Sequence, residues 1–217
     1  QQTFPNYPAL NPPAAANGKV YVATTGHQQT FLWAFDANTG TAVFQNSFSG
    51  QWPHVLAPTI RDGRVYTNGG YYGGGVYAFH ATGGDLQWAM FSGDDDMSTP
   101  AVDESRAYYY DGTALVTYDT ATGARLSSTI DPYNPGWGYS HHGAPMLGLE
   151  DSVTTFSGGA FSGRASSSVE QAGTRPLINF SVANNEVRWR TARTYRTQPA
   201  TAKGIVYAGS NTPKSFD

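Results

Sequence analysis

The sequence predicts an all-β fold, a β-propeller built from four-stranded antiparallel blades, and three observations predict it. Aromatic residues make up 14% of the 217 residues, and charged residues make up only 13%. With 25 Gly and 13 Pro, this balance favours short strands joined by many turns over helices. The sequence also repeats with a period of 42 to 54 residues, and each repeat contains four segments of strand character, here called A to D.

The first half of each repeat begins at a proline and leads through a turn into a Val-Tyr-type strand. Copies of this element start at Pro13, Pro58, Pro100, Pro145 and Pro199. The turns include Asn17-Gly18 and Asp62-Gly63, and such pairs adopt the positive φ angles that a tight hairpin needs. This half therefore predicts strands A and B joined by a short turn.

The second half of each repeat is an alternating strand closed by a turn that carries Gly or Asn, followed by one more strand. The copies with their turns are 31–40, 75–84, 114–123 and 176–185. Strand D then carries Val43-Phe44, Leu86-Gln87-Trp88, Arg125-Leu126 or Val187-Arg188-Trp189. A two-sheet sandwich also uses many short strands, but it does not repeat its sequence in register four times.

We expect a single propeller segment over residues 1–217, with four complete blades and part of a fifth. The expected blades cover residues 11–50, 56–92, 98–130 and 143–192, with a partial blade over 197–217. Residues 214–217 align with Trp33–Asp36, in the middle of strand C. Because natural domains rarely leave a sheet edge unpaired, we expect either a fragment of a seven- or eight-bladed propeller or completion of the ring by another chain.

The repeat carries a resemblance to a known family. The pattern Pro-x-x-x-x-Gly-x-Val-Tyr, followed by Ala-Phe-Asp-Ala-x-Thr-Gly-x-x-x-Trp, resembles the repeat of pyrroloquinoline quinone-like β-propellers over nearly the whole chain. That superfamily includes quinoprotein alcohol dehydrogenases and the non-catalytic propeller of outer-membrane assembly lipoproteins. The resemblance implies an extracellular or periplasmic location and aromatic side chains that wedge between blades. The residues expected in this core are Trp33, Trp88, Trp189, Tyr21, Tyr66 and Tyr207.

The non-catalytic branch of this family fits the sequence better than the catalytic one. In the dehydrogenases, the resemblance implies a quinone held by a Trp platform, a disulfide between adjacent cysteines, and a calcium bound by Glu and Asn beside a catalytic Asp. This chain has no cysteine, and no matching Glu/Asn/Asp set stands out. The sequence also shows no clear Ser-His-Asp elbow, phosphate loop or glycosidase carboxylate pair. We therefore assign no catalytic residue and expect no cofactor.

The loops predict which face binds a ligand. The A–B and C–D turns are short, whereas the B–C and D–A loops on the other face are long and rich in aromatic, His and Arg residues. Flat aromatic side chains flanked by hydrogen-bond donors suit a protein or carbohydrate partner. The candidate ligand-binding residues are Trp52, His54, Tyr71, Tyr72, Trp137, Tyr139, His141, His142, Tyr195 and Arg196.

A divalent ion is a further candidate ligand. His54, Asp96 and His141 each stand four residues before a strand-A proline, so they are expected to ring one mouth of the central channel. The alternative is that these three residues are solvated or form hydrogen bonds within their loops and bind no ion. The run Asp94–Asp96 also suits calcium, but it lacks the alternating ligands and downstream Glu of a dedicated calcium loop.

The favoured function is an exported, non-enzymatic binding or scaffold propeller that holds a protein or glycan partner. One alternative is an enzyme completed by further blades, either a quinoprotein-like oxidoreductase or one acting on polysaccharides. The other is a metal-binding module. With 13 basic against 16 acidic residues and no basic run, the chain lacks the charge of a nucleic-acid binder. No apolar run approaches the ~18 residues of a membrane span.

Overall fold

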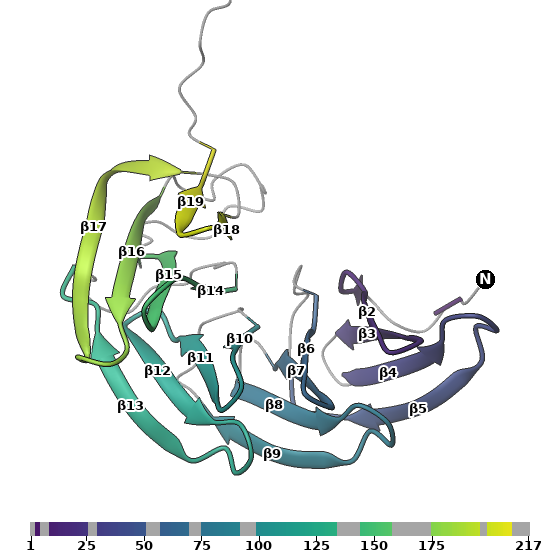
Figure 1. Ribbon diagram of the computed structural model, residues 1–217. Coiled ribbons are helices and arrows are strands. Elements are labelled where there is room, and N and C mark those ends of the chain that lie inside the picture. The colour runs from purple at the N-terminus through teal and green to yellow at the C-terminus, as the bar shows by residue number, and fades with distance from the viewer. Residues whose placement is uncertain are drawn as a thin grey trace, which may run out of the picture.

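The computed structural model describes residues 3–4, 9–25, 30–50, 57–69, 75–91, 99–133, 144–157, 175–195 and 199–209. Within these ranges the regular structure is β-strand, and the sheets follow one another around an open arc (Figure 1). Strand A of each sheet lies on the inside of the arc and strand D on the outside (Figure 1). The predicted all-β propeller is confirmed. No helix in the described ranges is long and apolar enough to cross a membrane.

Each blade is an antiparallel sheet whose strands pair in chain order. The first contains β2 (Ala14–Ala16), β3 (Lys19–Thr25), β4 (Phe31–Asp36) and β5 (Ala42–Ser47), with β1 (Ala9–Leu10) also paired to β3. The second contains β6 (Thr59–Arg61), β7 (Arg64–Asn68), β8 (Gly75–His80) and β9 (Leu86–Phe91). The third contains β10 (Ala101–Val102), β11 (Arg106–Tyr110), β12 (Ala114–Asp119) and β13 (Arg125–Ile130). The fourth contains β14 (Met146–Leu147), β15 (Ser152–Phe156), β16 (Arg175–Ser181) and β17 (Glu186–Tyr195). Strands β18 (Ala200–Ala202) and β19 (Ile205–Tyr207) form a two-stranded sheet at the end of the arc (Figure 1).

The internal repeat is visible in the strand register. In each of the four blades the pairing of strands C and D shifts at the same place, as at a β-bulge. The shifts fall between Ala34/Phe35, Ala78/Phe79, Thr117/Tyr118 and Asn179/Phe180. The strand-D residues that pair just before the shift are Phe44, Trp88, Ser127 and Trp189. These four positions are therefore structurally equivalent.

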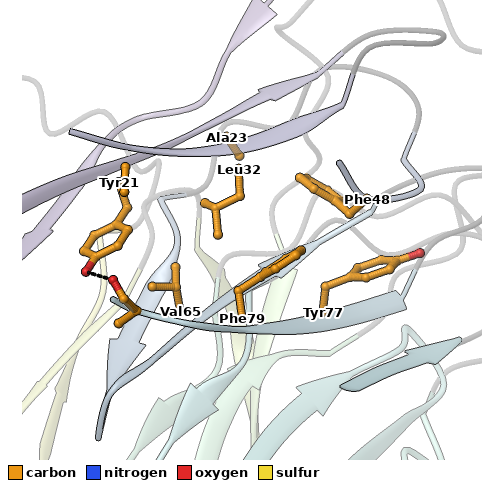
Figure 2. Close-up of a cluster of buried hydrophobic side chains, with 9 residues drawn as sticks. Tyr21, Ala23, Leu32, Phe48, Val65, Tyr77 and Phe79 are labelled. Carbon is orange, nitrogen blue, oxygen red and sulfur yellow. Dashed lines mark hydrogen bonds between the residues drawn. The ribbon is translucent and has the colours of Figure 1, made fainter. Parts of the chain in front are cut away.

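The hydrophobic core lies between the blades. In Figure 2, Tyr21 and Leu32 of the first blade point toward Val65 and Phe79 of the second. The Tyr21 hydroxyl also donates a hydrogen bond of 2.8 Å to the backbone carbonyl of Ala81, in the C–D turn of the second blade. Because side chains alternate along a strand, each blade buries one face against the preceding blade and the other against the next.

Three of the aromatic residues predicted to lie in the core are not fully buried: Trp33 is half-buried, and Trp189 and Tyr207 are exposed. Trp189 is 40% exposed and Tyr207 is 55% exposed, whereas Trp88 is only 7% exposed. The indole N–H of Trp88 donates a 2.9 Å hydrogen bond to the carbonyl of Thr120 in the next C–D turn. Among the described residues no C–D turn lies against Trp189, so its ring remains uncovered.

Candidate functional site

The two sets of long loops leave the blades at one edge, which we call the loop face. In each complete blade the last residue of strand D pairs with the first residue of strand C. These pairs are Ser47 with Phe31, Phe91 with Gly75, Ile130 with Ala114 and Tyr195 with Arg175. The D–A loop of a blade therefore begins beside the end of its B–C loop.

Most of the residues that the sequence singles out lie outside the described ranges. They are Trp52, His54, Tyr71, Tyr72, Asp96, Trp137, Tyr139, His141, His142 and Arg196. Tyr195 is described, and it ends β17 as a half-buried side chain beside the start of β16. Within the part of the chain that the structure describes, no group of three His, Cys, Asp or Glu residues is placed to hold a metal ion.

A buried carboxylate connects the bases of two long loops. Asp131 follows β13 directly and is 2% exposed. Its Oδ2 accepts a hydrogen bond of 2.7 Å from the Ser157 hydroxyl, and its Oδ1 accepts one of 2.8 Å from the backbone N–H of Tyr133. The Tyr110 hydroxyl lies 2.9 Å from the same Oδ2. Ser157 is the last described residue before 158–174, so Asp131 fixes the start of a third-blade loop against the start of a fourth-blade loop.

An arginine–tyrosine pair lies beside this buried network. The Arg190 guanidinium sits 4.8 Å from the centre of the Tyr133 ring, a cation–π contact. Its Nε is also 3.4 Å from the Ser157 hydroxyl oxygen. Tyr133 is 52% exposed. The network thus presents a flat aromatic ring and a positive charge to solvent at the loop face.

Two large apolar side chains stand exposed at the same face. Phe91 and Ile130 end β9 and β13 at equivalent register positions, and they are 73% and 72% exposed. We call the set Phe91, Ile130, Tyr133 and Arg190 the loop rim. Aromatic and Arg side chains are enriched in the cores of protein interfaces. None of the four rim residues was among the candidates predicted from the sequence. The first blade carries Ser47 at the position of Phe91.

The opposite edge, the turn face, holds tight turns closed by their own hydrogen bonds. The Asp36 carboxylate accepts hydrogen bonds from the backbone N–H groups of Asn38 and Thr39 and from the Thr39 hydroxyl. These bonds, led by the one from the Thr39 backbone, lower the pKa of Asp36. Asp119 makes the same set of bonds in the third blade, and the hydroxyl of Thr122 is the main cause of its lowered pKa. Carboxylates used in this way have little capacity left to bind a ligand.

A charged network joins the third and fourth blades at the turn face. The Tyr108 hydroxyl donates a 2.5 Å hydrogen bond to Asp103, and Arg106 bridges Asp103 and Asp151 at 3.3 and 2.9 Å. Burial alone would raise the pKa of Asp103, but the bonds from Tyr108 and from the backbone of Ser105 and Arg106 lower it overall. Burial and the Asp103 carboxylate together raise the pKa of Tyr108 well above its ordinary value.

The comparisons with known proteins agree with this architecture. The family model described as outer membrane protein assembly factor BamB matches residues 8–214. The chain belongs to this BamB family. The resemblance to pyrroloquinoline quinone-like propellers predicted from the repeat is thereby confirmed. Among curated proteins no sequence matches the chain.

The solved structures that resemble this chain share its fold. BamB from Moraxella catarrhalis has a TM-score of 0.64 at 20% identity, covering 92% of this chain and 57% of that one. A europium-containing methanol dehydrogenase has a TM-score of 0.64 at 13% identity, covering 93% of this chain and 47% of that one. The C-terminal WD40 domain of Sif2 has a TM-score of 0.60 at 8% identity, and the match covers 87% of this chain and 48% of that one. The chain thus spans about half the length of these structures.

This chain lacks one feature of the quinone site that the dehydrogenase branch implies. The chain has no cysteine, so the disulfide between adjacent cysteines is impossible. The described ranges also bring no three metal-ligating side chains together. No redox step is assigned to residues of this chain.

Proposed function

We propose that this member of the BamB family is a non-enzymatic scaffold that holds a partner protein on its loop face. The loop rim carries the proposal, because Phe91 and Ile130 expose large apolar side chains at the same face as an arginine–tyrosine pair. Exposed apolar side chains that gather on one face of a protein mark interaction sites. We propose that the aromatic and His residues predicted on the neighbouring loops belong to the same binding surface.

The family description suggests the class of partner. Its model is described as an outer membrane protein assembly factor, and we infer that the partner is a component of such an assembly system. A periplasmic location is part of this proposal. A protein partner takes precedence over the glycan also considered from the sequence, because the family described here is one of protein assembly.

Site-specific photo-crosslinking in cells that make the protein tests this function. A photoreactive amino acid is placed at Phe91, at Ile130 or at the turn-face control Asn38, and crosslinked species are identified by mass spectrometry. We expect one partner protein at Phe91 and Ile130 and none at Asn38. Equal crosslinking at the two faces, or crosslinking at Asn38 alone, contradicts the proposal.

Affinity measurements with the identified partner show how much each residue contributes to binding. Phe91→Ser and Ile130→Ser each remove an apolar contact of about 1–2 kcal/mol, so each is expected to weaken binding about tenfold. Trp137→Ala and Arg196→Ala, in the predicted loop site, are expected to do the same. Asn38→Ala is expected to leave the affinity unchanged. Melting temperatures matched to the wild type show that the blades remain folded in each variant.

A further inference from the structure

The β18–β19 hairpin lies beside the fourth blade (Figure 1), and a groove of about 370 Å³ opens between them. The hydroxyl of Thr201 in β18 donates a 3.0 Å hydrogen bond to the carbonyl of Leu147 in β14, which fixes the hairpin against the blade. Leu149 and Lys203, from the two A–B turns, belong to the lining, so the groove reaches the turn face. A cavity of this volume is large enough to hold a small ligand.

The lining is polar where the other junctions between described blades are mostly aromatic or apolar. Three positions differ: one on strand B, the one paired with it on strand C, and one on strand A of the following sheet. In this junction they hold Thr154, Asn179 and Thr201. The equivalents of Thr154 are Tyr21, Tyr66 and Tyr108, those of Asn179 are Ala34, Ala78 and Thr117, and those of Thr201 are Ile60, Val102 and Leu147.

The residue at the tyrosine position explains the space beside Trp189. In the second blade the ring centres of Tyr66 and Trp88 lie 5.8 Å apart. Trp189 stands at the position of Trp88, but Thr154 stands at that of Tyr66. Trp189 and Thr154 both line the groove, and Trp189 is 40% exposed. The space against the indole is therefore one that a six-membered ring occupies in the second blade.

This space also contains a hydrogen-bond acceptor without a donor. Asn179 is 4% exposed, and its side-chain N–H donates a 2.8 Å hydrogen bond to the Thr154 hydroxyl. Its Oδ1 accepts no hydrogen bond from the described residues. Because buried polar groups in proteins are nearly always paired, the groove favours an occupant that brings an O–H or N–H donor.

The charges in the lining favour an uncharged occupant. Nη1 of Arg188 lies 3.6 Å from Oε2 of Glu150, and its Nη2 donates a 2.9 Å hydrogen bond to the Glu150 carbonyl. These two charges therefore offset one another, and Lys203 lies exposed in its turn. Asn179, the register partner of Trp189, and Thr154 offer a neutral amide and a neutral hydroxyl.

We propose that the groove binds a neutral pyranose sugar, whose ring takes the place beside Trp189 that the Tyr66 ring takes beside Trp88. One face of a pyranose carries mainly C–H groups, which pack on the indole, and its hydroxyl groups donate to Oδ1 of Asn179. A flat apolar ligand would leave this acceptor unpaired, and water alone would leave the exposed indole without a contact. The site is separate from the loop rim, because the groove reaches the opposite edge of the blades.

Saturation-transfer NMR on the 217-residue protein tests the proposal. The probes are the methyl glycosides of glucose, galactose, mannose and N-acetylglucosamine. We expect at least one of them to receive saturation from the protein, most strongly at the ring C–H protons of one face. Titration of that glycoside then gives its Kd. Absence of transfer to all four glycosides overturns the proposal.

The other blades supply the matched variant. Thr154→Tyr combined with Asn179→Ala restores the Tyr–Ala pair of the first two blades. It is expected to fill the groove and to weaken glycoside binding at least tenfold, with a melting temperature equal to or above that of the wild type. Trp189→Leu is expected to weaken binding about tenfold, because the indole face is lost. Tyr133→Leu, at the exposed aromatic side chain of the loop rim, is the control and is expected to leave the affinity unchanged.

Unchanged affinity in the Thr154→Tyr/Asn179→Ala variant, or an equal loss in Tyr133→Leu, overturns the proposal. Asn179→Leu covers the case in which the double variant folds poorly. It keeps a side chain of similar size but removes the acceptor, so we expect about tenfold weaker binding in protein whose near-UV circular dichroism matches the wild type. Full affinity in this variant also overturns the proposal. Partner binding through Phe91 and Ile130 is measured separately, so the two proposals fail independently.

Discussion

The indole of Trp88 fills the space that a side chain on Gly123 would need. A Cβ built on Gly123 would lie 2.8 Å from two ring carbons of Trp88. The same glycine has a φ angle of +72°, which favours a residue without a Cβ. In the junction between the first and second blades, a Cβ on Gly84 would clash with the ring of Phe44 in the same way. The glycine of the C–D turn therefore serves both the turn and the packing of the preceding blade.

Gly123→Ala is expected to destabilise the protein by about 2–4 kcal/mol. The substitution combines the strain of a positive φ, about 1 kcal/mol, with a clash that forces Trp88 to shift. Gly18→Ala is the matched control, because Gly18 has the same φ of +72° but nothing within 4 Å of the added Cβ. It is expected to cost about 1 kcal/mol. Urea denaturation measures both, and equal losses would show that Trp88 does not constrain Gly123.

His80→Asp is expected to stabilise the second blade by about 0.5–1 kcal/mol. His80 holds the position that Asp36 and Asp119 hold in neighbouring blades, and its Nδ1 accepts only two long bonds of 3.4 Å from the N–H groups of Thr82 and Gly83. A carboxylate there shortens and strengthens both bonds. The free energy of unfolding at pH 7 measures the gain. His80→Ala serves as the control and is expected to lose stability.

Stability is expected to fall on acidification below about pH 4, and Asp103 contributes to the fall. The pKa of Asp103 is lower in the folded protein than its ordinary value of 3.8. Its contribution is therefore fully present above that value and is lost as pH falls through the lower folded pKa. Unfolding free energies between pH 2.5 and pH 6 are compared for wild type and Asp103→Asn. The variant is expected to be less stable at pH 6 and to lose less on acidification; parallel pH profiles would contradict this role.

The fold was more predictable from sequence than the site, for a physical reason. The strand pattern depends on local turns such as Asn17-Gly18 and on alternating apolar residues, and both recur in every repeat. Exposure depends on what lies against a residue, which no local pattern reports. Trp88 and Trp189 end similar strand-D motifs, yet within the described residues Trp88 has a C–D turn against it and Trp189 does not. Likewise, Asp131 and Ser157 are 26 residues apart, and only the packing of two blades brings them together.

Quinone binding separates the scaffold from the oxidoreductase alternative. Purified protein incubated with pyrroloquinoline quinone and calcium is expected to show no bound-cofactor absorbance after desalting and no alcohol-dependent dye reduction. The reason is the chemistry of the chain, which lacks the cysteines of the quinone-holding set. Stoichiometric retention of the quinone would instead favour the enzyme.

Asp131 is expected to act as a positioning residue for the loop face, although its carboxylate is buried. Asp131→Ala removes the acceptor of the buried Ser157 hydroxyl, which costs about 1–3 kcal/mol, whereas the Tyr110 hydroxyl still has the Gly112 carbonyl as an acceptor at 2.9 Å. Because Asp131 joins the bases of the loops that begin after Tyr133 and Ser157, partner binding is also expected to weaken about tenfold.

The control for Asp131 is a variant of similar stability loss far from these loops. Val65→Ala truncates a fully buried side chain between the first and second blades, at a cost of about 1–3 kcal/mol. Affinity for the partner and the free energy of unfolding are measured for both variants at a temperature where each is folded. Weaker binding by Asp131→Ala alone is the expected result. If both variants lose the same affinity, the loss of global stability explains the weaker binding. Asp131 would then stabilise the fold without positioning the loops.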